Sequence, residues 1–319
     1  MTIVVTGAAG FVGNNVIHKL LNAGKTVRAL VRKGGMEKAN IRLGKFGERV
    51  QIVEGDVRDR ARMMEVMRGA TAVVHTVAIS MEKRGATYED VNFQGTINVV
   101  DAAEKAGAER FIYIGQNGSS SSVPYRFLNS KGKAQDYVES SKLAWTALRP
   151  SAIFGPQDEF FNTFARLVRL TPFIFPLIGG GKAEFQPVSV YDVAEVVLRS
   201  LDDDKTIGQA YDLGGPEVLT LGEIEKRVIE ALGTSRLLVP VPVALLRPVV
   251  IVMQSVLPGS PVSTGLLDLL AVPNTVPRNA LVEVFGMTPI PFSGEHIAYL
   301  RNNTAGQALN KFFTNATVN

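Results

Sequence analysis

The stretch that decides the fold is MTIVVTGAAGFVG, residues 1–13. A β-branched run, Ile3–Thr6, leads into three glycines spaced G-x-x-G-x-x-G, after which a helical pattern begins. At a first strand-to-helix junction, Gly7 allows a tight turn and Gly10 lets backbone N–H groups approach a pyrophosphate. Gly13 lets the helix pack closely on the strand, and the helix N-terminus adds a positive dipole. The motif therefore predicts a dinucleotide-binding βαβ unit.

Short β-branched runs alternate with amphipathic helical patterns along the first half of the chain. This alternation predicts an α/β fold, a Rossmann doubly wound parallel sheet with a smaller C-terminal lobe. We expect a dinucleotide-binding domain over residues 1–150 and a substrate or partner lobe over 151–319, with some segments returning to the Rossmann core. The expected strands are Ile3–Thr6, Thr26–Val31, Val50–Glu54, Ala72–His75, Arg110–Ile114 and Ala144–Leu148. The expected helices are Gly10–Ala23, Arg60–Arg68, Tyr88–Ala106, Ser130–Glu139, Val190–Leu201 and Leu221–Leu232.

Composition excludes several classes of function. The 319 residues are 46% hydrophobic and 20% charged, and the net charge of +4 comes from scattered Lys and Arg, so we expect no nucleic-acid partner. The absence of cysteine excludes disulfides and thiol catalysis, and three distant histidines give no metal-ligand spacing. The sequence opens on a strand pattern without the features of a secretory signal, so we expect a cytoplasmic location.

The end of the second expected strand indicates which dinucleotide is bound. A domain that prefers NAD(H) usually places Asp or Glu there for the ribose 2′-hydroxyl. This chain has Arg32 and Lys33 instead. A guanidinium can grip a 2′-phosphate with two hydrogen bonds, so the prediction is NADP(H) in preference to NAD(H). The alternative is that both are solvated charges at a strand end.

Asp56, in the segment EGDVRD, follows the third expected strand. Its carboxylate could accept a hydrogen bond from the adenine amino group, or it could cap the N-terminus of the next helix. The sequence leaves both roles open.

The segment from Leu237 to Leu257 is strongly apolar but is interrupted by prolines and an arginine. A spanning helix needs about 20 mostly apolar residues in succession, so we expect no transmembrane span. The segment either packs within the second lobe or presents an apolar surface to a membrane or protein partner.

Further motifs follow the glycine turn along the chain. In order, the set is TGAAGFVG, GDVRD, VVHTVA (73–78), VNFQGTINVV (91–100), Ser130 with Lys131, LRPSAIFGP (148–156) and QPVSVYDVA (186–194). In order and spacing these motifs resemble those of the extended and atypical short-chain dehydrogenase/reductases. Within that family the chain resembles the branch that holds the Rossmann accessory subunit of respiratory complex I and its bacterial relatives. The C-terminal segments GGPEVLTLGEI, LLVPVPVALLRP and PVSTGLLDLLAVPNTV support the branch.

The resemblance implies cofactor contacts at matching positions: the three glycines at the pyrophosphate, Arg32 at the 2′-phosphate, Asp56 at adenine and Ala78 beside the adenosine ribose. Lys131 would reach the nicotinamide ribose, although a solvated helix lysine is the alternative. Pro150 would shape the loop over the nicotinamide. The full predicted cofactor-binding set is Gly7, Ala9, Gly10, Phe11, Val12, Gly13, Arg32, Lys33, Asp56, Val57, Ala78, Lys131, Pro150 and Ile153. We expect His75 to be a packed residue. We expect Asn92 to form hydrogen bonds with the backbone.

The sequence departs from the family at the proton donor. Active members carry a Tyr four residues before the Lys, and here that position is Phe127, which cannot act as an acid or base. The partner hydroxyl expected around Gly115–Asn117 is also missing. If the protein is active, Tyr125 and Lys131 are the catalytic candidates, with Tyr125 acting from just before the helix.

Two main functions remain in view, together with an assembly or biosynthesis scaffold for quinones or pigments that the sequence does not separate from the first. The first is an NADP(H)-binding protein with a structural cofactor, an accessory or assembly subunit of a membrane-associated complex such as complex I, peripheral on the inner face of the membrane. The alternative is an active NADP(H)-dependent reductase or epimerase acting on a quinone, isoprenoid or sugar-like carbonyl, with Tyr125 or a water supplying the proton.

Overall fold

The computed structural model describes residues 2–83, 85–256, 267, 270 and 272–314, which form two compact units. Unit 1 contains Met1–Pro150, Val190–Leu213 and Arg278–Met287, and unit 2 contains Ser151–Ser189, Gly214–Pro277 and Thr288–Asn319. Two segments from the second half of the sequence therefore belong to the N-terminal unit. Leu257 and most of the PVSTGLLDLLAVPNTV segment lie outside the described residues.

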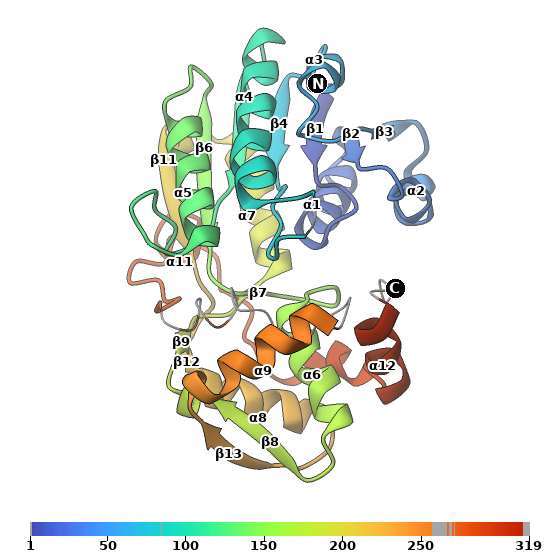
Figure 1. The fold of residues 1–319 in the computed structure, drawn as a ribbon. Coiled ribbons are helices and arrows are strands. Elements are labelled where there is room, and N and C mark those ends of the chain that lie inside the picture. Colours follow the sequence, from blue (N-terminus) through green and yellow to red (C-terminus); the bar gives the residue numbers. More distant parts are fainter. Residues whose placement is uncertain (1, 84, 257–266, 268–269, 271, 315–319) are drawn as a thin grey trace. The chain divides into compact units, whose positions relative to one another are not determined.

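A seven-stranded sheet forms the centre of unit 1, in the order β11-β6-β5-β4-β1-β2-β3 (Figure 1). Every neighbouring pair is parallel, which confirms the predicted doubly wound sheet. The seventh strand, β11, was not predicted. The strands are β1 (Thr2–Thr6), β2 (Thr26–Val31), β3 (Val50–Glu54), β4 (Ala72–His75), β5 (Arg110–Ile114), β6 (Trp145–Pro150) and β11 (Gln209–Leu213).

Helices cover the sheet of unit 1, with α3 beside α4, α4 beside α5 and α1 against α7. The predicted helix Tyr88–Ala106 consists of a π-helical turn, η2, followed by α4, and the helix predicted from Ser130 begins one turn earlier. The helical elements are α1 (Phe11–Asn22), α2 (Met36–Leu43), η1 (Gly44–Arg49), α3 (Arg60–Val66), η2 (Glu89–Gln94), α4 (Gly95–Lys105), α5 (Arg126–Glu139), α7 (Val190–Asp202), η4 (Asp204–Thr206) and α11 (Ala280–Glu283).

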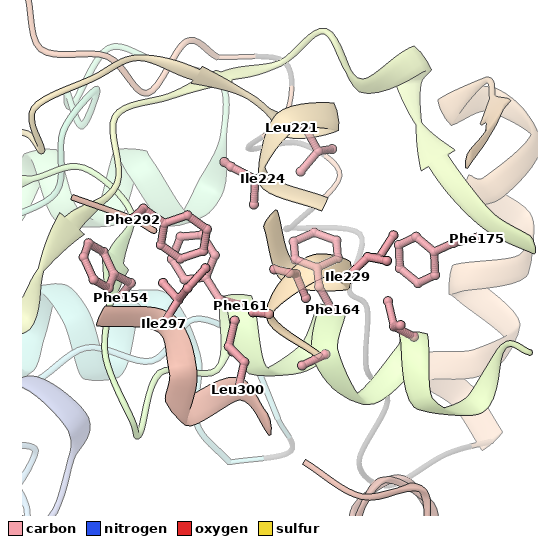
Figure 2. Packing of buried hydrophobic residues seen from close by; sticks show 14 of the residues in the cluster. Phe154, Phe161, Phe164, Phe175, Leu221, Ile224, Ile229, Phe292, Ile297 and Leu300 are labelled. Atoms are coloured by element: carbon pink, nitrogen blue, oxygen red, sulfur yellow. The ribbon is translucent and has the colours of Figure 1, made fainter. Parts of the chain in front are cut away.

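Unit 2 is built from helices and three two-stranded pairings, β10 with β7, β12 with β9 and β13 with β8. Aromatic rings fill its core: Phe161 lies 4.4 Å from Phe292 between ring centroids, and Phe154 packs edge-on against both (Figure 2). The elements are β7 (Ile153–Phe154), α6 (Phe160–Leu170), β8 (Ile174–Ile178), η3 (Gly179–Gly181), β9 (Glu184–Phe185), β10 (Val188–Ser189), β12 (Leu219–Thr220), α8 (Leu221–Ala231), β13 (Leu237–Val241), α9 (Val243–Val256), η5 (Gly294–Asn302) and α12 (Ala305–Thr314).

The apolar segment after Leu237 divides into β13, which pairs with β8, and α9, which contains Pro248. One side of α9 packs on the core of unit 2 through Val243, Leu246 and Val250. None of the helices in the described ranges combines the length and apolarity needed to cross a bilayer.

Candidate functional site

The turn between β1 and α1 has the conformation that the glycine motif predicts. Gly7 has a φ of +72°, a left-handed conformation that glycine adopts without strain. A Cβ at Gly13 would meet the backbone carbonyl of Gly7 and would lie 2.9 Å from Thr76 Oγ1. Because that hydroxyl already donates to the Thr6 carbonyl at 2.7 Å, it has little room to move. Gly13 is therefore required for close contact between α1 and the turn.

Gly10 lies at the N-cap of α1 and is exposed. Its own N–H donates to the Gly7 carbonyl at 2.9 Å, whereas the N–H groups of the first helical turn, which starts at Phe11 and Val12, have no partner within a helix. Ala9, in the turn, is half-buried. Backbone donors that have no helical partner at a helix N-terminus suit an anionic diphosphate, so this turn fits the group that the motif implies.

Arg32 and Lys33 are exposed directly after β2. No hydrogen bond or ion pair holds either side chain within the described part of the chain. The positive charge of Arg32 nevertheless acts on Asp56. This position is compatible with binding of a 2′-phosphate. It is equally compatible with two solvated charges at a strand end.

Asp56 does not cap a helix, so that alternative is wrong. Asp59 caps α3, because its side chain accepts a hydrogen bond from the Arg62 N–H at 2.9 Å. The Asp56 carboxylate is instead bound by Arg58, whose Nε and Nη2 donate at 3.0 and 2.7 Å and whose backbone N–H donates at 3.0 Å. Arg58, with a smaller contribution from the charge of Arg32, lowers the pKa of Asp56. Val57 is buried beside this pair.

A buried hydrogen-bond chain lies at the end of β4. His75 Nδ1 is 2.7 Å from Thr6 Oγ1, and Nε2 is 3.0 Å from Thr96 Oγ1. Since the Thr96 hydroxyl donates to the Asn92 carbonyl at 2.6 Å, it accepts from Nε2–H, and the Thr6 hydroxyl then donates to Nδ1. This arrangement satisfies a neutral imidazole. Burial, reinforced by the charge of Lys131, lowers the pKa of His75 to about 3, so the histidine is a packed residue and not a base.

Lys131 is buried in α5, so the alternative of a solvated lysine is wrong. Its Nζ donates to the Ile114 carbonyl at 2.6 Å and lies 4.6 Å from the centroid of the Tyr113 ring. Burial lowers the pKa of the Lys131 ammonium to about 7. The amine is thus held at the end of β5, among the carboxyl ends of the strands, where ligands bind in doubly wound folds.

The loop after β4 is anchored at several points. Asn92, in the π-helical turn, accepts from the Ile79 N–H at 2.8 Å and donates to Ser130 Oγ at 3.1 Å, so it bonds the backbone as expected. Glu82 pairs with Arg126 of α5 at 2.7 Å. Ala78 is exposed in this loop. These contacts hold the backbone of the loop in place, and Ala78 is exposed on it.

Phe127 is half-buried in the first turn of α5, and its ring packs edge-on against Tyr88 with centroids 5.6 Å apart. Tyr125 stands just before the helix, at its N-cap. The backbone of Gly115 is buried against Leu148, whose carbonyl accepts its N–H at 2.7 Å, and no hydroxyl occurs at residues 115–117. Neither expected hydroxyl is present at its predicted position.

Two predicted residues lie on either side of the division between the units. Pro150 is buried at the end of β6 in unit 1, where its carbonyl accepts the Asn117 N–H at 3.0 Å, whereas Ile153 belongs to β7 in unit 2. Across the described ranges, no three His, Cys, Asp or Glu side chains gather in a way that could hold a metal ion.

The profile of a family described as NAD(P)H-binding matches residues 7–204, more than half of the chain. The chain belongs to this NAD(P)H-binding family. A curated relative, NADH dehydrogenase (ubiquinone) 1 alpha subcomplex subunit 9 of Arabidopsis thaliana mitochondria, is 34% identical over 69% of this chain and 55% of its own length. The NADH-ubiquinone oxidoreductase 40 kDa subunit of Neurospora crassa is 25% identical over 80% of this chain and 67% of that one. The chain thus spans little more than half of the Arabidopsis relative.

Solved structures share the fold. The dTDP-glucose 4,6-dehydratase DesIV of Streptomyces venezuelae, a double mutant with NAD bound, has a TM-score of 0.71 at 20% identity and covers 95% of this chain and 98% of its own. The UDP-glucose 4-epimerase of Thermus thermophilus, in complex with NAD, has a TM-score of 0.61 at 25% identity over 76% and 86% of the two chains. Unit 1 is an NAD(P)-binding Rossmann domain related to both complex I subunits and epimerase-type enzymes.

Sequence reasoning missed Arg58. It belongs to the quoted GDVRD motif, and the D-x-R spacing was a usable signal, since a carboxylate two residues before an arginine in a turn can bind it locally. It also missed the anchoring of the loop by Glu82 and Arg126, which are 44 positions apart and carry no local signal.

Proposed function

We propose that this chain holds NADP(H) as a structural cofactor and acts as an accessory or assembly subunit of a membrane-associated complex of the complex I type, peripheral on the inner face of the membrane. The observation that carries the proposal is Phe127, four residues before the buried Lys131. The binding turn and the lysine are kept, while the group that would supply a proton is replaced by a ring that packs against Tyr88.

Four hydroxyls of unit 1, among them that of Ser130 beside Lys131, support this proposal, because each of the four donates its proton to a backbone carbonyl. Ser130 donates to the Phe127 carbonyl at 2.7 Å, and Tyr113 donates to the Lys131 carbonyl at 3.2 Å. Tyr88 donates to the Ser80 carbonyl at 3.0 Å, and Ser119 donates to the Gln116 carbonyl at 2.7 Å. A hydroxyl fixed in this way is a poor general acid.

In this proposal Arg32 determines the preference for NADP(H) over NAD(H). We expect the wild type to bind NADPH about 10 to 100 times more tightly than NADH, because charge-assisted hydrogen bonds to the 2′-phosphate contribute roughly 1.5 to 3 kcal/mol. Arg32→Ala should remove most of this preference in calorimetric titrations at one salt concentration. Arg68→Ala is the matched control, since this exposed arginine follows α3 and precedes Thr71, whose N–H donates to the Thr2 carbonyl at the amino end of β1. Equal affinity of the wild type for both cofactors contradicts the proposal.

The outer face of α9 supports a docking role. Leu245, Val249, Val252 and Val256 recur at helical spacing and are each more than half exposed, on the side away from the residues that pack on the core. A helix that is apolar on both sides is typical of one buried between two partners. Curated relatives of the chain are subunits of NADH-ubiquinone oxidoreductase, so we assign this face to the assembly.

The docking proposal predicts that a carboxylate on this face releases the chain from the assembly. In native gels of solubilised membranes from the source organism, the tagged wild type should migrate with NADH:quinone oxidoreductase activity, and Val252→Glu should reduce this fraction at least about tenfold, since burying an unpaired charge costs several kcal/mol. Ile41→Glu, at an apolar residue of unit 1 that is also more than half exposed, is the control. Migration of the wild type apart from that activity overturns the assignment.

A further inference from the structure

Strands β8 and β13 form a two-stranded ribbon in unit 2, and every residue of both strands, IFPLI and LLVPV, is apolar (Figure 1). One face packs on the core of the unit through Phe175 and Leu238. At the end where both strands begin, Ile174 is paired with Leu237, and their side chains are 53% and 66% exposed. Phe173, directly before β8, is 79% exposed, and its carbonyl accepts the Leu237 N–H at 2.9 Å. Phe173, Ile174 and Leu237 thus form one exposed apolar patch, the ribbon tip.

Three segments of unit 2, two of which carry the strands of the ribbon, contain seven Lys or Arg and no Asp or Glu. The whole chain is nearly balanced, with 34 basic and 30 acidic residues, so the positive charge is concentrated here. Of the acids that border the segments, Glu159 is bound by Arg166 and Lys311, and the charge of Glu230 acts on Arg227. The segments are residues 160–183, 231–256 and 296–314.

Arg236 brings a positive charge to the ribbon tip, because it directly precedes Leu237. Its Nε donates to the Thr171 carbonyl, and its Nη2 donates to the Val168 carbonyl at 3.1 Å. Both carbonyls belong to the end of α6, where a basic side chain is favoured by the helix dipole. This contact explains the position of Arg236. It does not require the surrounding segments to lack acids.

Two more arginines lie where the helices lead into the ribbon. Arg169, in the last turn of α6 and four residues before Phe173, donates from Nε to the Asn303 carbonyl at 3.0 Å. Arg301 donates from Nε at 3.0 Å to the carbonyl of Ala231, the last residue of α8. Within the described ranges, the Nη1 and Nη2 atoms of these two arginines donate to no group. Each guanidinium therefore keeps two donor nitrogens for an anion.

The charge and the two strands indicate what covers this surface. Pro176 in β8 and Pro240 in β13 interrupt the row of N–H groups that a third strand would need, which argues against strand addition. A second copy of the chain would place arginines opposite arginines, which costs free energy. An anionic bilayer suits both parts, because apolar side chains enter the boundary of the acyl chains while arginines stay at the phosphates.

We propose that the ribbon tip enters the interface of a bilayer that contains anionic phospholipid, with Phe173, Ile174 and Leu237 at the acyl boundary and the three arginines at the phosphate groups. The inference rests on the proposed peripheral location at a membrane, and it names the surface and the lipid. The outer face of α9 remains the contact with the protein assembly.

The test measures flotation of the full chain with vesicles of phosphatidylcholine or of an equal mixture of phosphatidylcholine and phosphatidylglycerol. The wild type should bind the mixed vesicles about 10 to 100 times more tightly, since each arginine near an anionic membrane contributes about fivefold. Phe173→Ser combined with Leu237→Ser should lower this binding about tenfold or more, because the apolar contact is lost. Arg169→Gln combined with Arg301→Gln should also lower it about tenfold, and leave the binding to phosphatidylcholine alone unchanged.

Ile41→Ser and Arg68→Gln are the matched controls, since both residues are exposed in unit 1. Both should bind vesicles like the wild type. Thermal unfolding of each variant checks that the fold is kept, as expected for replacements at exposed positions.

Phe173→Trp measures insertion directly. Phospholipid that carries bromine on its acyl chains should quench the fluorescence of the added tryptophan. Trp145, the single tryptophan of the natural chain, lies in β6 of unit 1 and gives the background signal. Ile41→Trp should show no quenching beyond that of the wild type.

Several results overturn the inference. One is equal binding of the wild type to both kinds of vesicle, or binding to neither. Another is unchanged binding of the Phe173→Ser, Leu237→Ser variant. Loss of vesicle binding in Val252→Glu would assign the lipid contact to α9. If the wild type binds no vesicles and the double serine variant leaves the fraction with NADH:quinone oxidoreductase activity, the ribbon tip contacts a protein. Migration of the wild type with that activity is a separate measurement, so the proposed function can hold where this inference fails.

Discussion

NADPH bound to this chain should stay unoxidised when quinones, isoprenoid carbonyls or keto sugars are added, with turnover about two to four orders of magnitude below the ordinary range of 1 to 10³ per second. A general acid typically contributes 10²- to 10⁴-fold, and Phe127 has no proton to give. Stopped-flow absorbance of the bound nicotinamide at full occupancy measures this rate.

Phe127→Tyr is the matched variant, because it adds one hydroxyl to a ring already packed on Tyr88. If the site still accepts a carbonyl, the variant should turn over faster than the wild type, with the gain limited by the missing hydroxyl at residues 115–117. A wild-type rate inside the ordinary enzyme range contradicts the structural-cofactor proposal and favours the reductase. If Tyr125→Phe then loses this turnover, Tyr125 is the proton donor of the reductase.

Gly13→Ala should lower the stability of the chain by about 3 kcal/mol and NADPH affinity by about 100-fold. Overpacking typically costs 1 to 3 kcal/mol, and here the added methyl meets backbone that cannot rotate away. If the chain relieves this clash, α1 moves away from the Gly7 turn, and the N–H groups of the first turn of α1 are then misplaced for the pyrophosphate. Denaturant unfolding with and without NADPH measures both effects.

Gly44→Ala is the control for this variant. Gly44 has ordinary helical dihedrals, with φ −56°, and a Cβ there meets nothing within 4 Å. We expect its stability to stay within about 0.5 kcal/mol of the wild type, as for surface substitutions without special features. If Gly13→Ala behaves like this control, the close packing at the turn has no energetic importance.

The fold was predictable because its signals are local. The six strands that sequence reasoning placed are β-branched runs bounded by turn residues, and the glycine spacing fixed the first crossover. The seventh strand, QAYDL at Gln209–Leu213, was missed because a short mixed run carries little periodic signal. Helix α6, Phe160–Leu170, was missed in a region whose Pro- and Gly-rich neighbours dominated the pattern.

The candidate site was less predictable, since its chemistry depends on contacts between distant residues. Nothing in the amphipathic pattern of α5 shows that Lys131 turns inward to the Ile114 carbonyl. The π-helical turn that aims Asn92 at Ile79 has no sequence signature comparable to a capping box. Asp56 was recognised as important, but its partner depends on the side-chain conformation of Arg58, which sequence alone does not determine.

The neutral Thr6–His75–Thr96 chain gives the layer beneath the glycine turn a constant charge. Histidine is the side chain that normally changes charge between pH 5 and 8, and here its pKa of about 3 removes it from that range. Acidification from pH 8 to pH 5 would then leave His75 unprotonated. Under the proposed structural role of the cofactor, this part of the support beneath the glycine turn would therefore keep the same charge between pH 5 and 8.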